Sequence, residues 1–234
     1  MGVSEKTYSN QEALEKLKKT RHSLSENCAG LFVLLLGGVT ISNPLPVFGS
    51  IPALGYQLKK LQKTSQIVLN MERILAEFAT NNVIVTPQLD VPDNGTLDLF
   101  VRFPDPPKKA VFTIGFRSNG HSTLFFSEEK QALCVRRKRG GLKQWNINLF
   151  QRFALQEYWL RKNQVEIFGT SSRDKNRSAV KVLVLTGNTK IGKHADHLYT
   201  EVGSLRVLMV KNRVSLFVIE EDQLIQFLRS WLEK

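Results

Sequence analysis

Two segments of alternating apolar residues, 97–103 and 110–117, constrain the fold of this chain more than any other feature of its sequence. Apolar side chains occupy every second position, namely Leu97, Leu99, Val101 and Phe103 in the first segment and Phe112, Ile114 and Phe116 in the second. Because side chains alternate between the two faces of a strand, this pattern predicts two adjacent β-strands that share an apolar face. Asp98 and Arg117 then lie on the opposite face, and the proline-rich residues between the strands form a turn.

Further strands and helices are expected on both sides of this pair. A helix at 57–80 and a short strand at 83–86 precede it, and a hairpin of strands at 122–126 and 132–135 follows. Asn148 is positioned to cap a helix at 149–162, one side of which carries Phe150, Phe153, Ala154 and Tyr158. The remaining expectations are a short strand at 165–168, a buried strand at 180–185, a loop at 186–201, paired strands at 205–210 and 214–219, and a C-terminal helix.

The balance of charge and the cysteine content limit the partners and the compartment. The net charge is +12 and the pI is about 9.8, which favours a polyanionic partner, either nucleic acid or an anionic membrane surface. Cys28 and Cys134 lie far apart and belong to no spaced cluster, so a zinc site and a disulfide framework are not expected. A reducing, cytoplasmic location fits this cysteine usage.

Residues 27–58 contain no Asp, Glu, Lys, Arg or His. A spanning helix needs about 20 mainly apolar residues, but here the apolar run that begins at Ala29 is interrupted by Pro44 and Pro46. Lysines and arginines flank both sides, and such flanks tend to stay cytoplasmic. We therefore expect a basic amphipathic helix at 1–28 and an apolar helical hairpin at 29–58 that dips into a membrane and returns to the same side. A hairpin buried in a protein core, or one that binds a protein partner, explains the same pattern.

From about Lys63 to the end, the order of elements resembles the restriction-endonuclease-like superfamily, in particular its nuclease-related domain family. In that superfamily, a helix with a Glu is followed by a strand with an Asp, a strand with Glu-x-Lys, and a second helix that often carries a Gln. The resemblance places Glu72 or Glu77, Asp98 and Gln151 at these positions. It implies that residues 59–234 form an α/β domain, a mixed sheet flanked by helices, in which Asp98 is a ligand of Mg²⁺.

The Glu-x-Lys motif departs from the family pattern, since Gly115 stands in place of the Glu and Arg117 in place of the Lys. Glycine supplies no ligand, and Mg²⁺ requires several oxygen ligands, so Asp98 alone would bind the ion poorly. Arginine stays protonated, which suits phosphate binding but not proton transfer. We expect a remnant site of Glu77, Asp98, Arg117 and Gln151 without hydrolysis. If Glu77 instead supplied the missing carboxylate, an active Mg²⁺-dependent nuclease would remain.

A run of cations provides a second candidate for phosphate binding. It comprises Arg136, Arg137, Lys138, Arg139 and Lys143, and Trp145 follows as a residue that could stack on a base. The same composition suits a solvated hairpin end, and an aromatic residue near a helix start also suits a core. Gly187 to Lys193 approaches a phosphate-loop pattern, but His194 replaces the Ser or Thr that would bind Mg²⁺.

Taken together, these patterns predict a nucleic-acid-binding domain derived from a nuclease, impaired in catalysis and attached to the cytoplasmic face of a membrane. DNA is the expected partner. Two alternatives stay open, namely a membrane-associated scaffold that binds protein through the apolar hairpin, and an active Mg²⁺-dependent nuclease.

Overall fold

The computed structural model describes residues 9–40, 45–105, 108–145, 148–212 and 214–233. Within 36–40 and 45–50 it describes the backbone alone. The chain divides into two compact units, residues 1–72 and 73–234. The protein is mixed α/β, with five α-helices and two mixed sheets in its described part. The expected fold class is therefore confirmed at this level.

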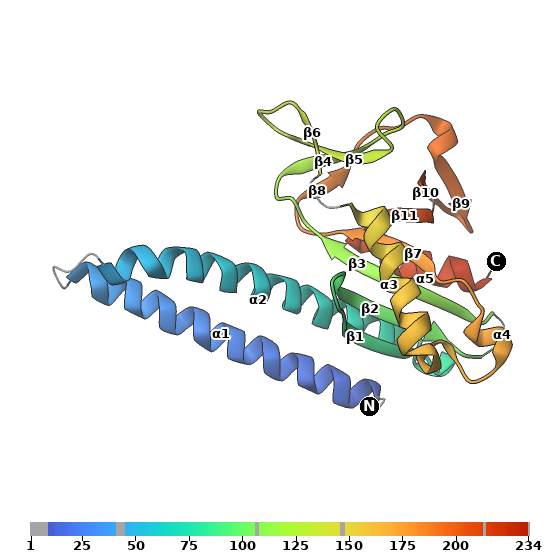
Figure 1. The fold of residues 1–234 in the computed structure, drawn as a ribbon, viewed down its shortest axis with the longest axis horizontal. Coiled ribbons are helices and arrows are strands. Elements are labelled where there is room, and N and C mark those ends of the chain that lie inside the picture. Colours follow the sequence, from blue (N-terminus) through green and yellow to red (C-terminus); the bar gives the residue numbers. More distant parts are fainter. Residues whose placement is uncertain (1–8, 41–44, 106–107, 146–147, 213, 234) are drawn as a thin grey trace. The chain divides into compact units, whose positions relative to one another are not determined.

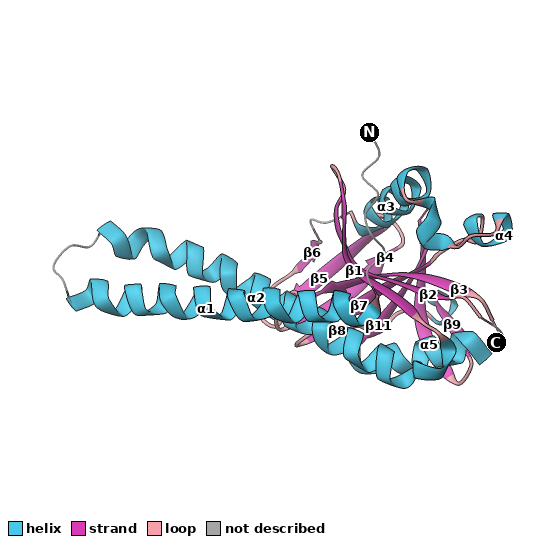
Figure 2. Ribbon diagram, turned by 90° about the horizontal axis from the view of Figure 1, so that it is seen from below, coloured by secondary structure: helices cyan, strands magenta, loops and turns pink. Residues whose placement is uncertain are grey.

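Unit 1 is a pair of antiparallel helices, α1 (Asn10–Thr40) and the greater part of α2 (Leu45–Glu77). They run side by side in Figure 1 and Figure 2, and Lys18 of α1 forms an ion pair with Glu72 of α2 at 3.1 Å. Buried residues recur along each helix at the spacings of a paired seam, as at Leu17, Leu24 and Cys28 on α1. The basic helix expected at 1–28 and the first part of the apolar stretch thus belong to one continuous helix, Asn10–Thr40.

The helix expected at 57–80 begins earlier, at Leu45, and ends at Glu77, so the second part of the apolar stretch also belongs to it. Pro46 lies in the first turn of α2. Backbone N–H groups in the first turn have no partner within the helix, so a proline there costs no helical hydrogen bond. Pro44, the first of the two prolines that interrupt the apolar run, lies outside the described residues. In the part of the chain that is described, no helix has an apolar stretch long enough to cross a membrane.

Unit 2 is built on a seven-stranded sheet. A short 3₁₀ turn (Ala79–Asn81) leads into an antiparallel meander of β1 (Ile84–Val91), β2 (Gly95–Phe103) and β3 (Ala110–Arg117). Next comes β7 (Val180–Leu185), which is parallel to β3 and to β11 (Val214–Glu220), and the sheet ends with β10 (Leu205–Asn212) and β9 (Tyr199–Val202). The expected buried strand at 180–185 is confirmed as the centre of this sheet.

Helices cover both faces of the seven-stranded sheet (Figure 1). Phe227 and Trp231 of α5 (Leu224–Glu233) meet Phe112 of β3, with ring centroids 6.4 and 6.1 Å apart. Phe153 of α3 (Leu149–Asn163) lies against Gly115, which points to the other face of the same strand. The α3 helix is the crossover between β3 and β7, and Asn148 caps it as expected by accepting a hydrogen bond from the Gln151 N–H.

Unit 2 also contains a four-stranded sheet. Three of its strands follow β3 in the sequence and precede α3, and the fourth follows β7. Its order is β6 (Leu142–Gln144), β5 (Ala132–Arg137), β4 (Ser122–Ser127) and β8 (Thr189–Ile191). The β4–β5 hairpin matches the expected strands at 122–126 and 132–135. Leu124, Phe126, Leu133 and Val135 belong to the hydrophobic core of unit 2, so one face of this sheet is packed.

Three expectations about local structure were wrong. Val165–Phe168 is a 3₁₀ helix rather than a strand, and the expected loop at 186–201 contains β8, a 3₁₀ turn (Asp196–Leu198) and β9. Tyr158 is 66% exposed instead of buried, because the packed side of α3 is formed by Leu149, Phe150, Phe153, Gln156 and Leu160. Two further short helices, α4 (Ser172–Lys175) and a 3₁₀ turn (Glu221–Gln223), complete the fold.

Candidate functional site

Asp98 and Arg117 form an ion pair on the α3 side of the sheet. Arg117 Nη1 donates to Asp98 Oδ2 at 2.6 Å, and the Phe116 N–H donates to the same oxygen at 2.8 Å. The side chains are 1% and 12% exposed. The alternation of β2 and β3 thus brings together the acid and the guanidinium as expected, and the carboxylate is held by two donors.

Gly115 lies next to this pair, beneath the ring of Phe153. A Cβ atom at position 115 would lie 2.9 Å from Phe153 Cζ, closer than real Cβ atoms approach a neighbour. A side chain at this position therefore requires the ring to move. In the resemblance this is the position of the second carboxylate, and here the space is filled by an aromatic ring from α3.

Arg152 and Gln156 line the same space, and the sequence patterns did not indicate either of them. Arg152 Nη2 donates to the Thr96 carbonyl at 3.4 Å, and Gln156 Nε2 donates to the Asn94 carbonyl at 3.1 Å. Burial lowers the pKa of Arg152, the nearby charge of Arg117 lowers it further, and Asp98 raises it. Residues 149, 152, 153 and 156 are three or four positions apart, so a helix places Arg152 and Gln156 on the same face as Phe153.

The chemistry of this space does not fit Mg²⁺. One carboxylate meets two guanidinium groups, and the lining residues leave no volume that a water molecule could occupy. Mg²⁺ binds oxygen ligands and keeps several of its waters. Among the described residues, no three His, Cys, Asp or Glu side chains gather in a way that could hold a metal ion.

Glu77 and Gln151, the other two residues of the expected remnant site, do not line this space. Glu77 accepts hydrogen bonds from Nε of Arg229 at 3.0 Å and from its Nη2. Gln151 is exposed in the first turn of α3, where its Oε1 accepts a hydrogen bond from Asn148. Glu72, the alternative to Glu77, pairs with Lys18 in unit 1.

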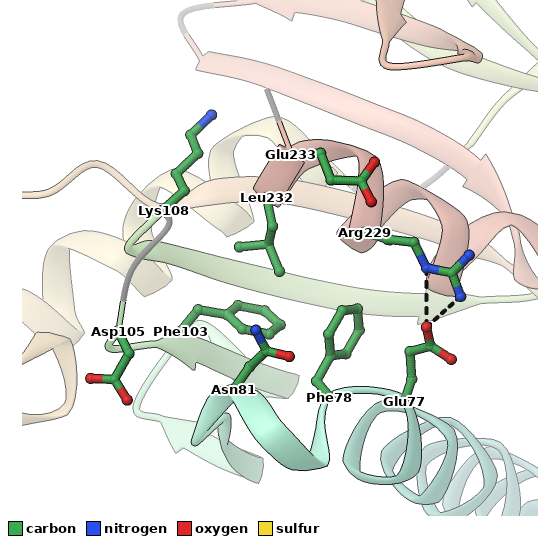
Figure 3. A pocket seen from close by; sticks show the side chains of 9 residues that line it. All are labelled: Glu77, Phe78, Asn81, Phe103, Asp105, Lys108, Arg229, Leu232 and Glu233. Carbon is green, nitrogen blue, oxygen red and sulfur yellow. Dashed lines mark hydrogen bonds and ion pairs between the residues drawn. The ribbon is translucent and has the colours of Figure 1, made fainter.

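Glu77 instead borders a surface pocket of about 220 Å³ that Figure 3 shows. The rings of Phe78 and Phe103 meet edge to face at its floor, with centroids 5.0 Å apart. Its other lining residues are Asn81, Asp105, Lys108, Arg229, Leu232 and Glu233. Sites for small organic ligands have volumes of roughly 300–1,000 Å³, so this pocket is smaller than such sites.

The expected phosphate-binding run forms the exposed end of the β5–β6 hairpin. Arg136, Arg137, Lys138, Arg139 and Lys143 are all exposed. In the described part of the chain, none of these five cations forms an ion pair with an acid. By contrast, Trp145 is half-buried, packs against the core of unit 2 and donates its backbone N–H to the Leu133 carbonyl at 2.8 Å. The cations of the run are available to a ligand, whereas Trp145 is part of the core packing.

The segment that approaches a phosphate-loop pattern has a structural role. Thr189–Ile191 is strand β8, and His194 Nε2 accepts the Phe126 N–H at 2.8 Å while its Nδ1 lies 2.7 Å from the Gly192 carbonyl. Burial lowers the pKa of His194, and the hydrogen bond to Gly192 raises it in part. The ring therefore serves as a neutral bridge between β4 and the residues after β8.

Comparisons with models of protein families, with curated proteins and with solved structures found no match to this chain.

Proposed function

We propose that this protein binds nucleic acid through the β5–β6 hairpin, that its α/β unit derives from a restriction-endonuclease-like nuclease that has lost hydrolysis, and that α1 and α2 attach it to a membrane. The observation that carries the proposal is the set of five exposed cations without acidic partners in the described part of the hairpin. Contacts from such residues to phosphates give affinity without sequence preference.

The order of elements supports descent from a nuclease. A helix precedes three antiparallel strands, with an acid on the second strand and a cation on the third. After the strands β4, β5 and β6 come a crossover helix and a strand parallel to the third. The helix, the strand with an acid, the next strand with a cation and the later helix are the elements that the resemblance implies for the superfamily. The ion pair of Asp98 with Arg117, and Phe153 above Gly115, support a loss of catalysis.

The apolar half of the helical hairpin supports attachment to a membrane. Phe32, Val33 and Leu34 of α1 and Ile51 and Tyr56 of α2 are each more than half exposed. From Cys28 to Thr40, a helix that rises about 1.5 Å per residue covers about 20 Å, whereas the hydrocarbon core of a bilayer is about 30 Å thick. The hairpin is thus long enough to enter one leaflet from one side without crossing.

The full-length chain in detergent, titrated into a fluorescent DNA oligonucleotide at several salt concentrations, tests the proposed binding. We expect the triple variant R137Q/K138Q/R139Q to weaken binding and to reduce the salt slope by up to about three, since each phosphate contact contributes about 0.9. The variant K130Q/K162Q/R173Q removes the same charge from other exposed positions and serves as the matched control.

Two outcomes would overturn the proposal. One is no binding at low salt, and the other is an equal loss in both variants, which would show a general effect of net charge. Mg²⁺-dependent cleavage that disappears in Asp98→Ala would support the active nuclease instead.

A scaffold that binds protein is the second candidate function, because a protein surface could also cover the exposed apolar side chains of α1 and α2. This function predicts that the purified chain forms a stable protein complex through these side chains without any lipid. Flotation of the chain with lipid vesicles distinguishes such a complex from attachment to a membrane.

A further inference from the structure

The two faces of the four-stranded sheet differ in what covers them. One face is packed into the core through Leu124 and Val135. The other face is covered near its Ala132 end, where Ala132 and Cys134 are buried and the centroids of the His194 and Phe125 rings lie 6.0 Å apart. The opposite end of this second face is open.

The strand registers define a row of four residues across this open end. Arg136 of β5 pairs with Leu142 of β6 and with Thr123 of β4, and Thr123 pairs with Lys190 of β8. Paired residues on neighbouring strands point to the same face, so these four side chains share it. Arg136, Leu142 and Lys190 are exposed, and Thr123 is half-buried. We refer to this row as the open face.

The guanidinium group of Arg136 packs against an aromatic ring on the open face. Its guanidinium carbon lies 5.0 Å from the centroid of the Phe125 ring, and in the described part of the chain it has no acidic partner. Lys190 differs, since its ammonium group binds Glu220 at 2.6 Å while the side chain stays 62% exposed. The open face therefore offers one planar cation backed by a ring, with Lys138 and Arg139 at the adjoining hairpin end.

We propose that the open face binds single-stranded nucleic acid, with a base stacked on the Arg136 guanidinium and phosphates bound by Lys138 and Arg139. This inference rests on the proposed function and names its substrate. Proteins bind unpaired bases by stacking them on aromatic rings and on arginine planes, and such bases are accessible only in single strands.

Duplex recognition would use the same cations in another way. A two-stranded β-ribbon fits the major groove of DNA, but β6 has only three residues, and β5 is joined on its other side to β4. The hairpin is thus the border of a wider sheet rather than an isolated ribbon. A broad face of this kind suits a single strand laid across it.

The test compares the full-length protein in detergent with a fluorescent oligothymidylate and with a DNA duplex of the same length. Arg136→Lys keeps the positive charge but replaces the planar guanidinium group on which a base would stack. We expect this variant to bind the single strand about fivefold to tenfold more weakly. Arg173→Lys is the matched control, because Arg173 is an exposed cation of α4 that lies outside the four-stranded sheet. We expect this control to bind as the unmodified chain does.

The outcomes separate the two proposals. Equal or tighter binding of the duplex, or the same affinity for Arg136→Lys and Arg173→Lys, would overturn the proposal for the open face while leaving the proposed binding by the hairpin intact. Failure of both probes to bind would overturn both proposals.

Discussion

The ring of Phe153 fills the room that a side chain at position 115 would need, and this one contact determines what the space beside Asp98 can hold. An added carboxylate would have to displace the ring, and it would then compete with Asp98 for Arg117 and Arg152. Restoring a metal site therefore requires changes on both β3 and α3 rather than one substitution.

Gly115→Ala is expected to lower the free energy of unfolding by about 1–3 kcal/mol, because the added methyl overpacks a filled space. Urea-induced unfolding of the full-length chain measures the change. Combining it with Phe153→Leu should give less destabilisation than the sum of the two single variants, since the smaller side chain makes room. Gly141→Ala is the control, because no atom lies within 4 Å of a Cβ at that position. Equal effects at both glycines would contradict this account.

The alternation of β2 and β3 predicted that Asp98 and Arg117 share a face, because a strand has a period of two that is local in sequence. Arg152 and Gln156 could not be assigned to this site in the same way. Their place depends on how α3 crosses the sheet, and that crossing is set by packing between residues more than fifty positions apart. Likewise, nothing in the sequence indicated that Glu77 would pair with Arg229.

Among the elements, α3 and the central strand β7 are joined by a buried ionic contact. Glu157 of α3 binds the Lys181 ammonium group of β7, accepts the Ala179 N–H at 3.2 Å and pairs with Arg161 at 2.7 Å. Lys181 is 7% exposed. Removing one partner would leave a buried charge without compensation, which costs about 3–5 kcal/mol.

Glu157 should make the fold sensitive to acid. Burial raises the pKa of Glu157, but hydrogen bonds from Lys181 and Arg161 outweigh it and lower the pKa below its ordinary value of 4.5. Because the folded pKa lies below the unfolded one, the stabilisation is complete above pH 4.5 and is lost as the pH falls through the folded value. Unfolding free energies measured against pH should fall less steeply in acid for Glu157→Gln than for the unmodified chain.

Glu166→Gln supplies the control for this measurement. Glu166 is exposed, and its carboxylate makes no ion pair within the described part of the chain. An acid dependence that is the same in the Glu157 variant and the unmodified chain would refute the role of this contact.

Short elements were the ones that sequence reasoning missed. Val165–Phe168 has the apolar content of a strand but forms a 3₁₀ helix. In this helix Phe168 packs edge to face on Phe100, with ring centroids 5.1 Å apart. The three residues of β8 carry no strong strand preference and form a strand only through pairing with β4. Longer periodic segments such as β7, β10 and β11 were predicted correctly, because their burial repeats over enough residues to be recognised.

Among the described residues, two surfaces differ in their chemistry. Exposed apolar side chains gather on α1 and α2 between residues 27 and 58, where no charge is present. Five exposed cations without acidic partners gather on the described part of the β5–β6 hairpin, which also carries the exposed side chain of Leu142. A protein that enters one leaflet and binds a polyanion needs both surfaces. Each can be removed without touching the other.

The variant F32E/L34E is expected to lose its association with vesicles of mixed neutral and anionic lipid, because carboxylates are costly within the hydrocarbon layer. Flotation of the full-length protein measures the association. The matched control S23E/S25E adds the same charge to exposed positions of α1 outside the uncharged stretch. If the unmodified chain does not float and instead forms a stable protein complex that F32E/L34E disrupts, the scaffold is the correct interpretation.

The place of β7 in the sheet has a consequence for how the protein is made. Strands β1, β2 and β3 are consecutive and can associate as soon as they leave the ribosome, but the neighbour of β3 on its far side is synthesised more than sixty residues later. Until then, β3 presents an unpaired backbone edge that any other extended chain could join. A nascent polypeptide stalled between residues 117 and 180 should therefore aggregate readily or recruit a chaperone, while the completed chain does not.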